Sequence, residues 1–278
     1  MPTNHESLAR RVAELFIALP EVEAVALGGS RGGGGLGHDR ASDIDVYVFT
    51  RGEIGLDVRR GIVEAAGGAS RADLGMTFWG PGDEWLDATT HIHVDVVYFG
   101  VDWMTDQVDR VLVRHEASLG YSTCLWHTVR GSVILEDPRG WLAALKGRSR
   151  GAYPEALRRN VIELNHAVLR GPLPAYSTQV AKAARRGDLV SVNHRLAGLL
   201  ASYFDVLFAF NRVPHPGEKR LVEAAAGLPR TPGGMTTDLR DLLESATTDL
   251  SGLPVRVDRL LDRLDALLGG DGFTAPSG

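Results

Sequence analysis

Three aspartates carry the clearest chemical signal in the chain. Asp43 and Asp45 stand two residues apart at the start of one apolar segment, and Asp95 lies inside a second apolar segment. Side chains alternate between the faces of a β-strand, so the first two acids would point the same way. Two carboxylates that close resist joint ionisation unless a cation neutralises them, and hard oxygen ligands favour Mg²⁺ or Mn²⁺. The pattern therefore predicts a divalent metal site.

A glycine-rich stretch precedes these acids. Gly28 and Gly29 would let the backbone approach a phosphate closely, and Ser30 can donate its hydroxyl and amide to phosphate oxygens. Arg31 is a candidate charge partner for the phosphate, and an arginine paired with a surface acid is the alternative interpretation. The chain lacks the Gly-Lys-Ser/Thr of a P-loop, and a strand with paired acids follows the glycines where a Rossmann unit has a helix. Both of those nucleotide sites are therefore disfavoured.

The order of these residues resembles the signature of the DNA polymerase beta-type nucleotidyltransferase superfamily. That signature is an apolar strand, Gly-Gly/Ser, a spacer, Asp-x-Asp and a later Asp on a neighbouring strand. Here it reads Gly29-Ser30, Asp43-Ile44-Asp45 and Asp95. The resemblance implies transfer of a nucleoside monophosphate from an NTP to a hydroxyl, with release of pyrophosphate. It also implies that Asp43 and Asp45 bind two metal ions, and that Asp95 completes the second metal site and is the candidate acceptor of the hydroxyl proton.

The layout of the whole chain is similar to that of aminoglycoside and lincosamide nucleotidyltransferases. By this resemblance the acceptor is a hydroxylated small molecule such as an antibiotic or a biosynthetic intermediate, and the NTP is taken as ATP on frequency alone. A nucleotidyl modifier of tRNA or protein stays open. Residues 211–220 resemble a turn in the antibiotic-type enzymes where a basic residue reaches the triphosphate, and Lys219 is our candidate for it. Lys182 and Arg158 are weaker candidates, because basic residues on helices are usually only solvated.

Histidines supply further candidates and one alternative function. His91 and His93 would alternate on the strand face of Asp95 and so could approach the substrate, whereas His38 lies in the glycine loop. Arg159 and His166 stand two helical turns apart and resemble the loose Arg-x₄₋₆-His pattern of HEPN-type ribonucleases. A nucleotide-binding regulator without turnover is a third hypothesis, which three clustered acids speak against.

Length and composition set the frame for these hypotheses. The 278 residues suggest two domains, each able to bury a core. A net charge of −5 disfavours binding to long nucleic acid, since such binding depends on basic side chains displacing counterions. The single cysteine, Cys124, excludes an internal disulfide framework and fits a reducing compartment. With no signal-peptide pattern and no long apolar run, we expect a cytoplasmic protein outside the membrane.

Periodicity indicates an α+β protein: a small mixed-sheet catalytic domain over residues 1–115, followed by a helical bundle domain over residues 116–278. We expect the bundle to hold the acceptor and close over the nucleotide. The catalytic domain is expected to contain helices over 7–19 and 56–66 and strands over 22–27, 44–50, near 76–79 and over 91–99. In the bundle the pattern predicts helices over 153–169, with Pro154 in its first turn, and over 189–210 as the core helix.

Overall fold

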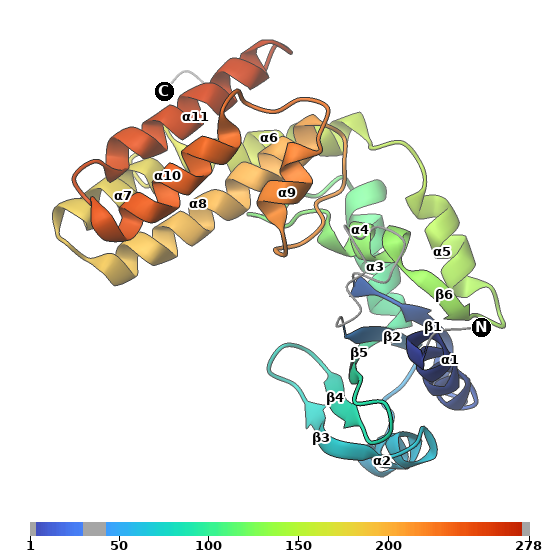
Figure 1. Ribbon diagram of the computed structural model, residues 1–278. Coiled ribbons are helices and arrows are strands. Elements are labelled where there is room, and N and C mark those ends of the chain that lie inside the picture. The colour runs from blue at the N-terminus through green and yellow to red at the C-terminus, as the bar shows by residue number, and fades with distance from the viewer. Residues whose placement is uncertain (1–3, 30–42, 274–278) are drawn as a thin grey trace. The chain divides into compact units, whose positions relative to one another are not determined.

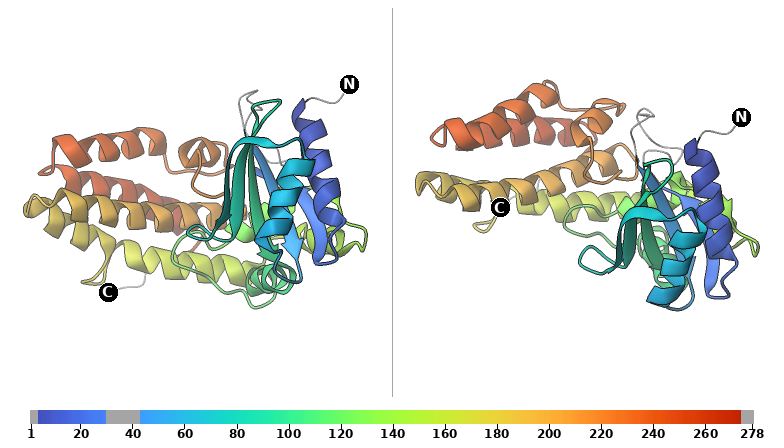
Figure 2. Two further views of the ribbon diagram at one scale, coloured as in Figure 1. Left: turned by 90° about the horizontal axis from the view of Figure 1, so that it is seen from below. Right: turned by 60° about the horizontal axis from the view of Figure 1, so that its bottom comes forward.

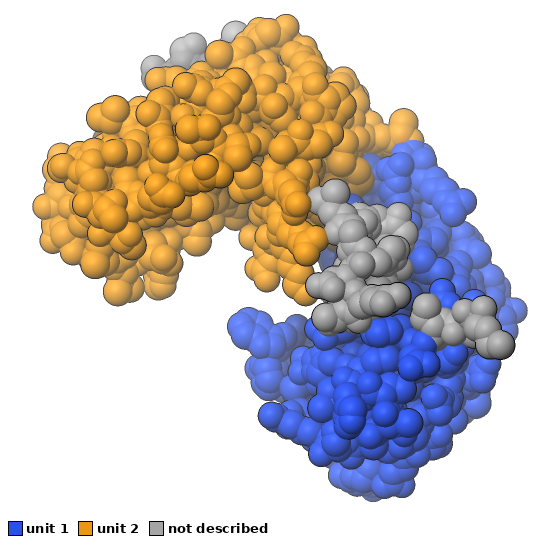
Figure 3. All heavy atoms as spheres, viewed as in Figure 1, with its two compact units in different colours: residues 1–109, 125–151 blue, residues 110–124, 152–278 orange. Residues whose placement is uncertain are grey.

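The chain folds into two compact units, which Figure 3 distinguishes by colour. The computed structural model describes residues 4–29 and 43–273, drawn as ribbons in Figures 1 and 2. Unit 1 comprises residues 1–109 and 125–151, and unit 2 comprises residues 110–124 and 152–278. Residues 125–151, which the sequence analysis assigned to the helical domain, therefore belong with the sheet.

Unit 1 is built on a mixed sheet. Its strands, within the described residues, are β1 (Val22–Leu27), β2 (Ile44–Thr50), β3 (Ala69–Met76), β4 (Gly82–Asp87), β5 (His93–Gly100) and β6 (Val133–Glu136). The helices along this part of the chain are α1 (Asn4–Ile17), α2 (Leu56–Ala65), α3 (Val101–Leu112), α4 (Cys124–Gly131) and α5 (Trp141–Ser149). The strand order is β3-β4-β5-β2-β1-β6, in which β2 and β5 are parallel and the other neighbours are antiparallel.

Helices α1 and α2 lie side by side over one face of the sheet (Figure 2). Ile44, Val46 and Val48 of β2 are fully buried in the core cluster that includes these helices, as are Val94 and Val96 of β5. Because side chains alternate along a strand, the residues between them point to the other face. The apolar positions of the two central strands thus form the core under α1 and α2, and Asp45 and Asp95 are among the intervening positions on the other face.

Strands β3, β4 and β6 differ from the sequence predictions. The strand expected near 76–79 is displaced, because β3 ends at Met76 and residues 77–81 connect it to β4. Phe78 and Trp79 lie in that connection and are 71% and 93% exposed. Neither β4 nor β6 was expected. Strand β3 is mostly exposed, so it lacks the apolar residues that marked β1 and β2.

Unit 2 is helical. Within the described residues its helices are α6 (Glu155–Leu169), α7 (Tyr176–Arg185), α8 (Leu189–Phe210), α9 (Leu221–Ala226), α10 (Met235–Thr248) and α11 (Leu253–Gly269). Helix α8 packs against α6, α7, α9 and α10, which confirms residues 189–210 as a core helix. Pro154 is the N-cap of α6, one position before the first turn. None of the described helices is long and apolar enough to cross a lipid bilayer. The fold class is α+β, as expected.

Candidate active site

Asp45 and Asp95 are direct neighbours across the two central strands. They are partners in the parallel register of β2 and β5, on strands about 4.8 Å apart, and they point away from α1 and α2. Tyr47 is the next residue of β2 on that face. Burial raises the pKa of the Tyr47 phenol, and the charges of Asp45 and Asp95 raise it further. The structure therefore brings two of the three expected acids together, beside a tyrosine.

The glycine pair at the end of β1 fits tightly over these side chains. Gly29 has φ +56°, and a Cβ built there would lie 1.8 Å from Oδ2 of Asp45. A Cβ on Gly28 would lie 2.1 Å from ring carbons of Tyr47. The Gly28 amide donates to the Asp45 carbonyl at 2.8 Å, and the Gly29 amide donates to the Tyr47 hydroxyl at 3.3 Å. Only glycine allows the backbone to pass this close to the acids.

Asp43 and His93 form the border of this face. Asp43 precedes β2, its side chain is 60% exposed, and its Oδ1 lies 3.6 Å from Nδ1 of His93. Nε2 of His93 lies 3.6 Å from Oε2 of Glu84, the register partner of Asp95 on β4. The expectation for His93 thus fits its position on the face of Asp95. His91 differs, because it lies before β5 at φ 56°.

The donor set agrees in kind with a hard cation, since carboxylate oxygens are the ligands that Mg²⁺ and Mn²⁺ prefer. Side-chain placement agrees less well. Over residues 4–29 and 43–273, no three His, Cys, Asp or Glu side chains are gathered as a metal-binding group. Asp45 and Asp95 are strand neighbours, while the carboxylate of Asp43 is close to His93. Asp43, Asp45 and Asp95 as ligands of two metal ions therefore stay a prediction.

Several expected nucleotide-binding residues cannot be placed beside these acids. Ser30, Arg31 and His38 lie outside the described residues. Lys219 is exposed in the loop between α8 and α9 of unit 2, and Lys182 is exposed on α7. Binding of the triphosphate by Gly29, Ser30, Arg31 and Lys219 accordingly remains a prediction.

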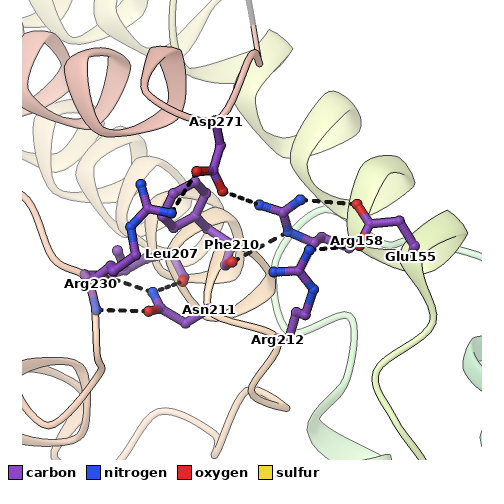
Figure 4. A network of polar contacts seen from close by, with 8 residues as sticks. All are labelled: Glu155, Arg158, Leu207, Phe210, Asn211, Arg212, Arg230 and Asp271. Carbon is purple, nitrogen blue, oxygen red and sulfur yellow. Dashed lines mark hydrogen bonds and ion pairs between the residues drawn. The ribbon is translucent and has the colours of Figure 1, made fainter.

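Arg158 has a structural role inside unit 2 (Figure 4). It is 4% exposed, and its guanidinium donates to Glu155 at 3.0 Å, to Asp271 at 3.1 Å and to the Phe210 carbonyl at 3.3 Å. Its Cζ also lies 4.6 Å from the ring centroid of Phe273. These partners join α6, the end of α8 and the segment after α11, so we exclude Arg158 as a triphosphate ligand.

The histidine of the ribonuclease hypothesis, His166, is buried inside unit 2. His166 is 7% exposed, and its Nε2 lies 2.6 Å from Oδ1 of Asp265 on α11. Arg170 also donates to Asp265, at 2.8 Å. Arg159, by contrast, is exposed. A histidine buried between two helices is not accessible to an RNA strand. His166 therefore has a structural role, and its position argues against the ribonuclease hypothesis.

Cys124 is an unsuitable nucleophile. Burial raises the pKa of its thiol to about 12, so the reactive thiolate is scarce at neutral pH. Its Sγ lies 3.3 Å from Nδ1 of His215, which also accepts the Gly217 amide at 3.1 Å. The thiol therefore belongs to the packing of unit 2.

Two residues of the face were missed in the sequence. Tyr47 could have been found by extending the alternation of Asp43 and Asp45 by one step. Glu84 could not, because its segment was not recognised as a strand, and only the β4–β5 pairing brings it opposite Asp95. The carboxylate row therefore spans Glu84, Asp95 and Asp45 on three adjacent strands.

Comparisons with known proteins add little to this geometry. No family model matches the chain, and no curated protein matches it. Among solved structures, the chain is similar to a nucleotidyltransferase-like protein from Exiguobacterium sibiricum 255-15. The identity is 17% and the TM-score 0.44, over 96% of this chain and 75% of that one. Such a distant likeness carries no argument about function, which has to come from the residues.

Proposed function

We propose that the protein is a metal-dependent nucleotidyltransferase, which moves a nucleoside monophosphate from an NTP to a hydroxyl of a small molecule and releases pyrophosphate. The observation that supports it most is the pairing of Asp45 with Asp95 on parallel strands, directly under the Gly28-Gly29 turn. An acid pair beside a close-passing backbone suits a phosphate group held through a cation. Adenine as the base, and an antibiotic or biosynthetic intermediate as the acceptor, are the finer parts of this proposal.

Each residue has a distinct task in this proposal. Asp43, Asp45 and Asp95 would hold the metal ions, which supply charge neutralisation at the phosphates and lower the pKa of the attacking hydroxyl. Asp95 would accept the proton of that hydroxyl. The backbone at Gly29, together with Ser30 and Arg31, would bind the triphosphate, and Lys219 would add a positive charge to it. Phosphoryl-type transfer depends mainly on such positioning and charge stabilisation, so no covalent nucleophile is required.

The test is a transfer assay with defined variants. Purified protein is incubated with Mg²⁺, each α-labelled NTP and a panel of aminoglycosides, lincosamides, tRNA and the protein itself. Pyrophosphate release and the position of the label are measured. We expect label on a small molecule, and a loss of at least about 10²-fold in Asp45→Asn and Asp95→Asn.

Asp57→Asn is the matched control, because Asp57 is 95% exposed on α2 and its carboxylate pairs with Arg60 of the same helix. It should leave transfer unchanged. Label on tRNA or on protein would move the activity to a macromolecular modifier. Transfer that survives in both Asp45→Asn and Asp95→Asn would disprove the proposed site.

A further inference from the structure

Unit 1 contains a cavity of about 440 Å³ away from the carboxylate row. It lies at the carboxyl ends of the parallel strands β2 and β5, where it is lined by Thr50, Tyr98 and Gly100. Asp45 stands at the opposite end of β2, about 16 Å along the strand. Tyr98 also belongs to the face that packs on α1, because its ring meets Phe16. The volume is that of a small-molecule site, and carboxyl ends of parallel strands are common places for one.

Arg59 is held rigidly in the wall of this cavity. Its side chain is 13% exposed, and its Nη1 donates to Oδ1 of Asp83 at 3.1 Å. Asp83 is 1% exposed and also accepts the Tyr98 hydroxyl at 2.5 Å and the Gly75 amide at 2.7 Å. The guanidinium lies 5.2 Å from the centroid of the Tyr98 ring. The Arg59 charge is thus fixed in place by a carboxylate that also accepts hydrogen bonds from two other donors.

Arg59 has more donors than this arrangement uses. Its Nε is buried and has no hydrogen-bond partner among the residues that the structure describes. An arginine offers five N–H groups in a fixed fork, and the part beyond Nη1 suits a planar oxyanion. Because Arg59 lines the cavity and its contact with Asp83 uses Nη1, an oxyanion in the cavity would meet the rest of this guanidinium.

Arg51 adds a second guanidinium to the lining. Its Nε donates to Oε2 of Glu23 at 2.7 Å, and Arg139 donates to the same oxygen at 2.7 Å. Glu23 is 1% exposed and is shared between these two arginines, and the charge of Asp102 also acts on Arg51. Arg51 is itself half-exposed, and its Nη groups are therefore accessible to a ligand.

The other residues that line the cavity determine how apolar a ligand is and which charge it carries. Ile54, Met76 and Pro81 contribute apolar surface. Helix α2 begins directly after Ile54, with Gly55 as its N-cap. Gly55 offers no side-chain acceptor to the first amides of the helix, so the partial positive charge of this helix end adds to the positive charge of the arginines. Glu53 is the opposing charge: of the described residues that line the cavity, it is the one carboxylate.

We propose that this cavity binds a small organic oxyanion, in which a carboxylate or phosphate meets Arg51 and Arg59 and an apolar body contacts Ile54, Met76 and Pro81. The site is separate from the carboxylate row and does not rest on the proposed transferase function. It gives the chain a second small-molecule site in unit 1.

Backbone amide NMR of the full chain tests the proposal, with EDTA present so that metal-bound phosphate at the acids is excluded. The probes are benzoate and phenyl phosphate, which separate a carboxylate source from a phosphate source, inorganic phosphate, which lacks the apolar body, and benzamide, which lacks the charge. We expect benzoate or phenyl phosphate to shift amides of residues 50–56, 75–77 and 98–101 more strongly than benzamide or inorganic phosphate does.

Three substitutions make the result specific. Arg51→Gln should weaken binding by about tenfold, the usual loss for one charge-assisted hydrogen bond. Glu53→Gln should tighten it, because a like charge is removed. Arg60→Gln is the matched control and should leave binding unchanged, since Arg60 lies on α2 with the same exposure as Arg51, 54%, but outside the cavity lining. Arg59 is left intact, because its loss would strand the buried Asp83.

Four results would overturn the proposal. The first is the absence of shifts at these amides with any probe. The second is equal binding of benzamide and benzoate, which would indicate a purely apolar pocket. The third is equal loss of affinity in Arg51→Gln and Arg60→Gln. The fourth is weaker binding in Glu53→Gln, which would indicate a cationic ligand. Each of these results can be obtained whether or not the protein has transferase activity. A negative result at the cavity therefore does not affect the transfer assay that tests Asp45 and Asp95.

Discussion

At the scale of single residues, packing inside the protein requires Gly28 and Gly29 to lack a side chain, in addition to any requirement of a bound phosphate. Gly28 makes room for the ring of Tyr47, and Gly29 makes room for the carboxylate of Asp45. Tyr47 in turn accepts the Gly29 amide. The turn, the tyrosine and the acid therefore form one packed unit, in which a change at one position displaces the others.

Gly28→Ala tests this coupling. The added methyl would overlap the Tyr47 ring, so the ring or the turn must move. We expect a loss of about 1–3 kcal/mol in the free energy of unfolding, together with a loss of transferase activity. Urea denaturation and the transfer assay measure the two effects. Tyr47→Ala should relieve the overlap, so the double variant should be more stable than the sum of the single losses predicts.

Gly61→Ala serves as the control, because a Cβ there meets no atom within 4 Å and the position lies inside α2. It should be neutral or stabilising by about 1 kcal/mol, through helix propensity alone. Equal stability of Gly28→Ala and the parent chain would contradict the close packing of the turn on Tyr47.

The sequence allowed part of this site to be predicted. Asp45 and Asp95 could be expected at one site, because the motif resembles one in which these acids lie on neighbouring strands, and each lies in an apolar segment with the pattern of a strand. The arrangement of Asp43 with His93 and Glu84 could not, since it depends on where β2 begins and on the pairing of β4 with β5. Strand pairing is a tertiary property, and no local pattern specifies it.

At the scale of elements, the segments that could be predicted from the sequence were those whose apolar residues form a continuous run. β1, β2 and α8 have the expected bounds, because each is an apolar run that ends at turn residues or a proline-containing segment. β4 was missed because two of its acids are buried: Asp83 is satisfied by Arg59, and Asp87 accepts the amide and hydroxyl of Thr90. β6 is a short edge strand, and its partner β1 lies more than a hundred residues away.

Asp205 of α8 joins that helix to the segment before α4. Its carboxylate accepts the Ser122 amide at 3.1 Å, the Ser122 hydroxyl at 2.5 Å and the Asn165 amide at 3.2 Å. Burial nevertheless raises the pKa of Asp205 to about 6, against an ordinary value of 3.8. Between these two values the folded protein holds a proton that the unfolded chain releases. This group therefore makes the free energy of unfolding fall as the pH rises from about 4 to about 6.

Asp205→Asn removes this titration. The stability difference between the parent chain and the variant should shrink by about 2–3 kcal/mol between pH 4 and pH 7, because two pKa units correspond to about that energy. Urea denaturation followed by fluorescence at a series of pH values measures it. Asp188→Asn is a contrasting control: Asp188 is the half-exposed N-cap of α8, and hydrogen bonds from Ser191 lower its pKa, so its contribution to stability is lost as the pH falls. A difference between the parent chain and Asp205→Asn that stays constant with pH would contradict the raised pKa.

At the scale of the whole molecule, the two units are interleaved in the chain. Residues 110–124 pack with the helices of unit 2, and residues 125–151 return to unit 1. The returning segment completes the sheet: Ile134 of β6 pairs with Ala26 of β1, and Trp141 of α5 lies 5.2 Å from the ring of Phe49 on β2. A sequence boundary near residue 115 follows the change in periodicity, but the sheet has its own boundary at residue 151.

This interleaving predicts different outcomes for two truncations. A chain of residues 1–151 keeps β6 and α5, so it should unfold cooperatively on its own, with residues 110–124 as an unpacked connection. A chain of residues 1–115 leaves the edge of β1 without its partner and uncovers Phe49, and exposed strand edges promote aggregation. Urea denaturation by circular dichroism and size-exclusion chromatography distinguish them. If 1–115 were as monomeric and cooperative as 1–151, then β6 and α5 would be dispensable additions to a sheet that is complete without them.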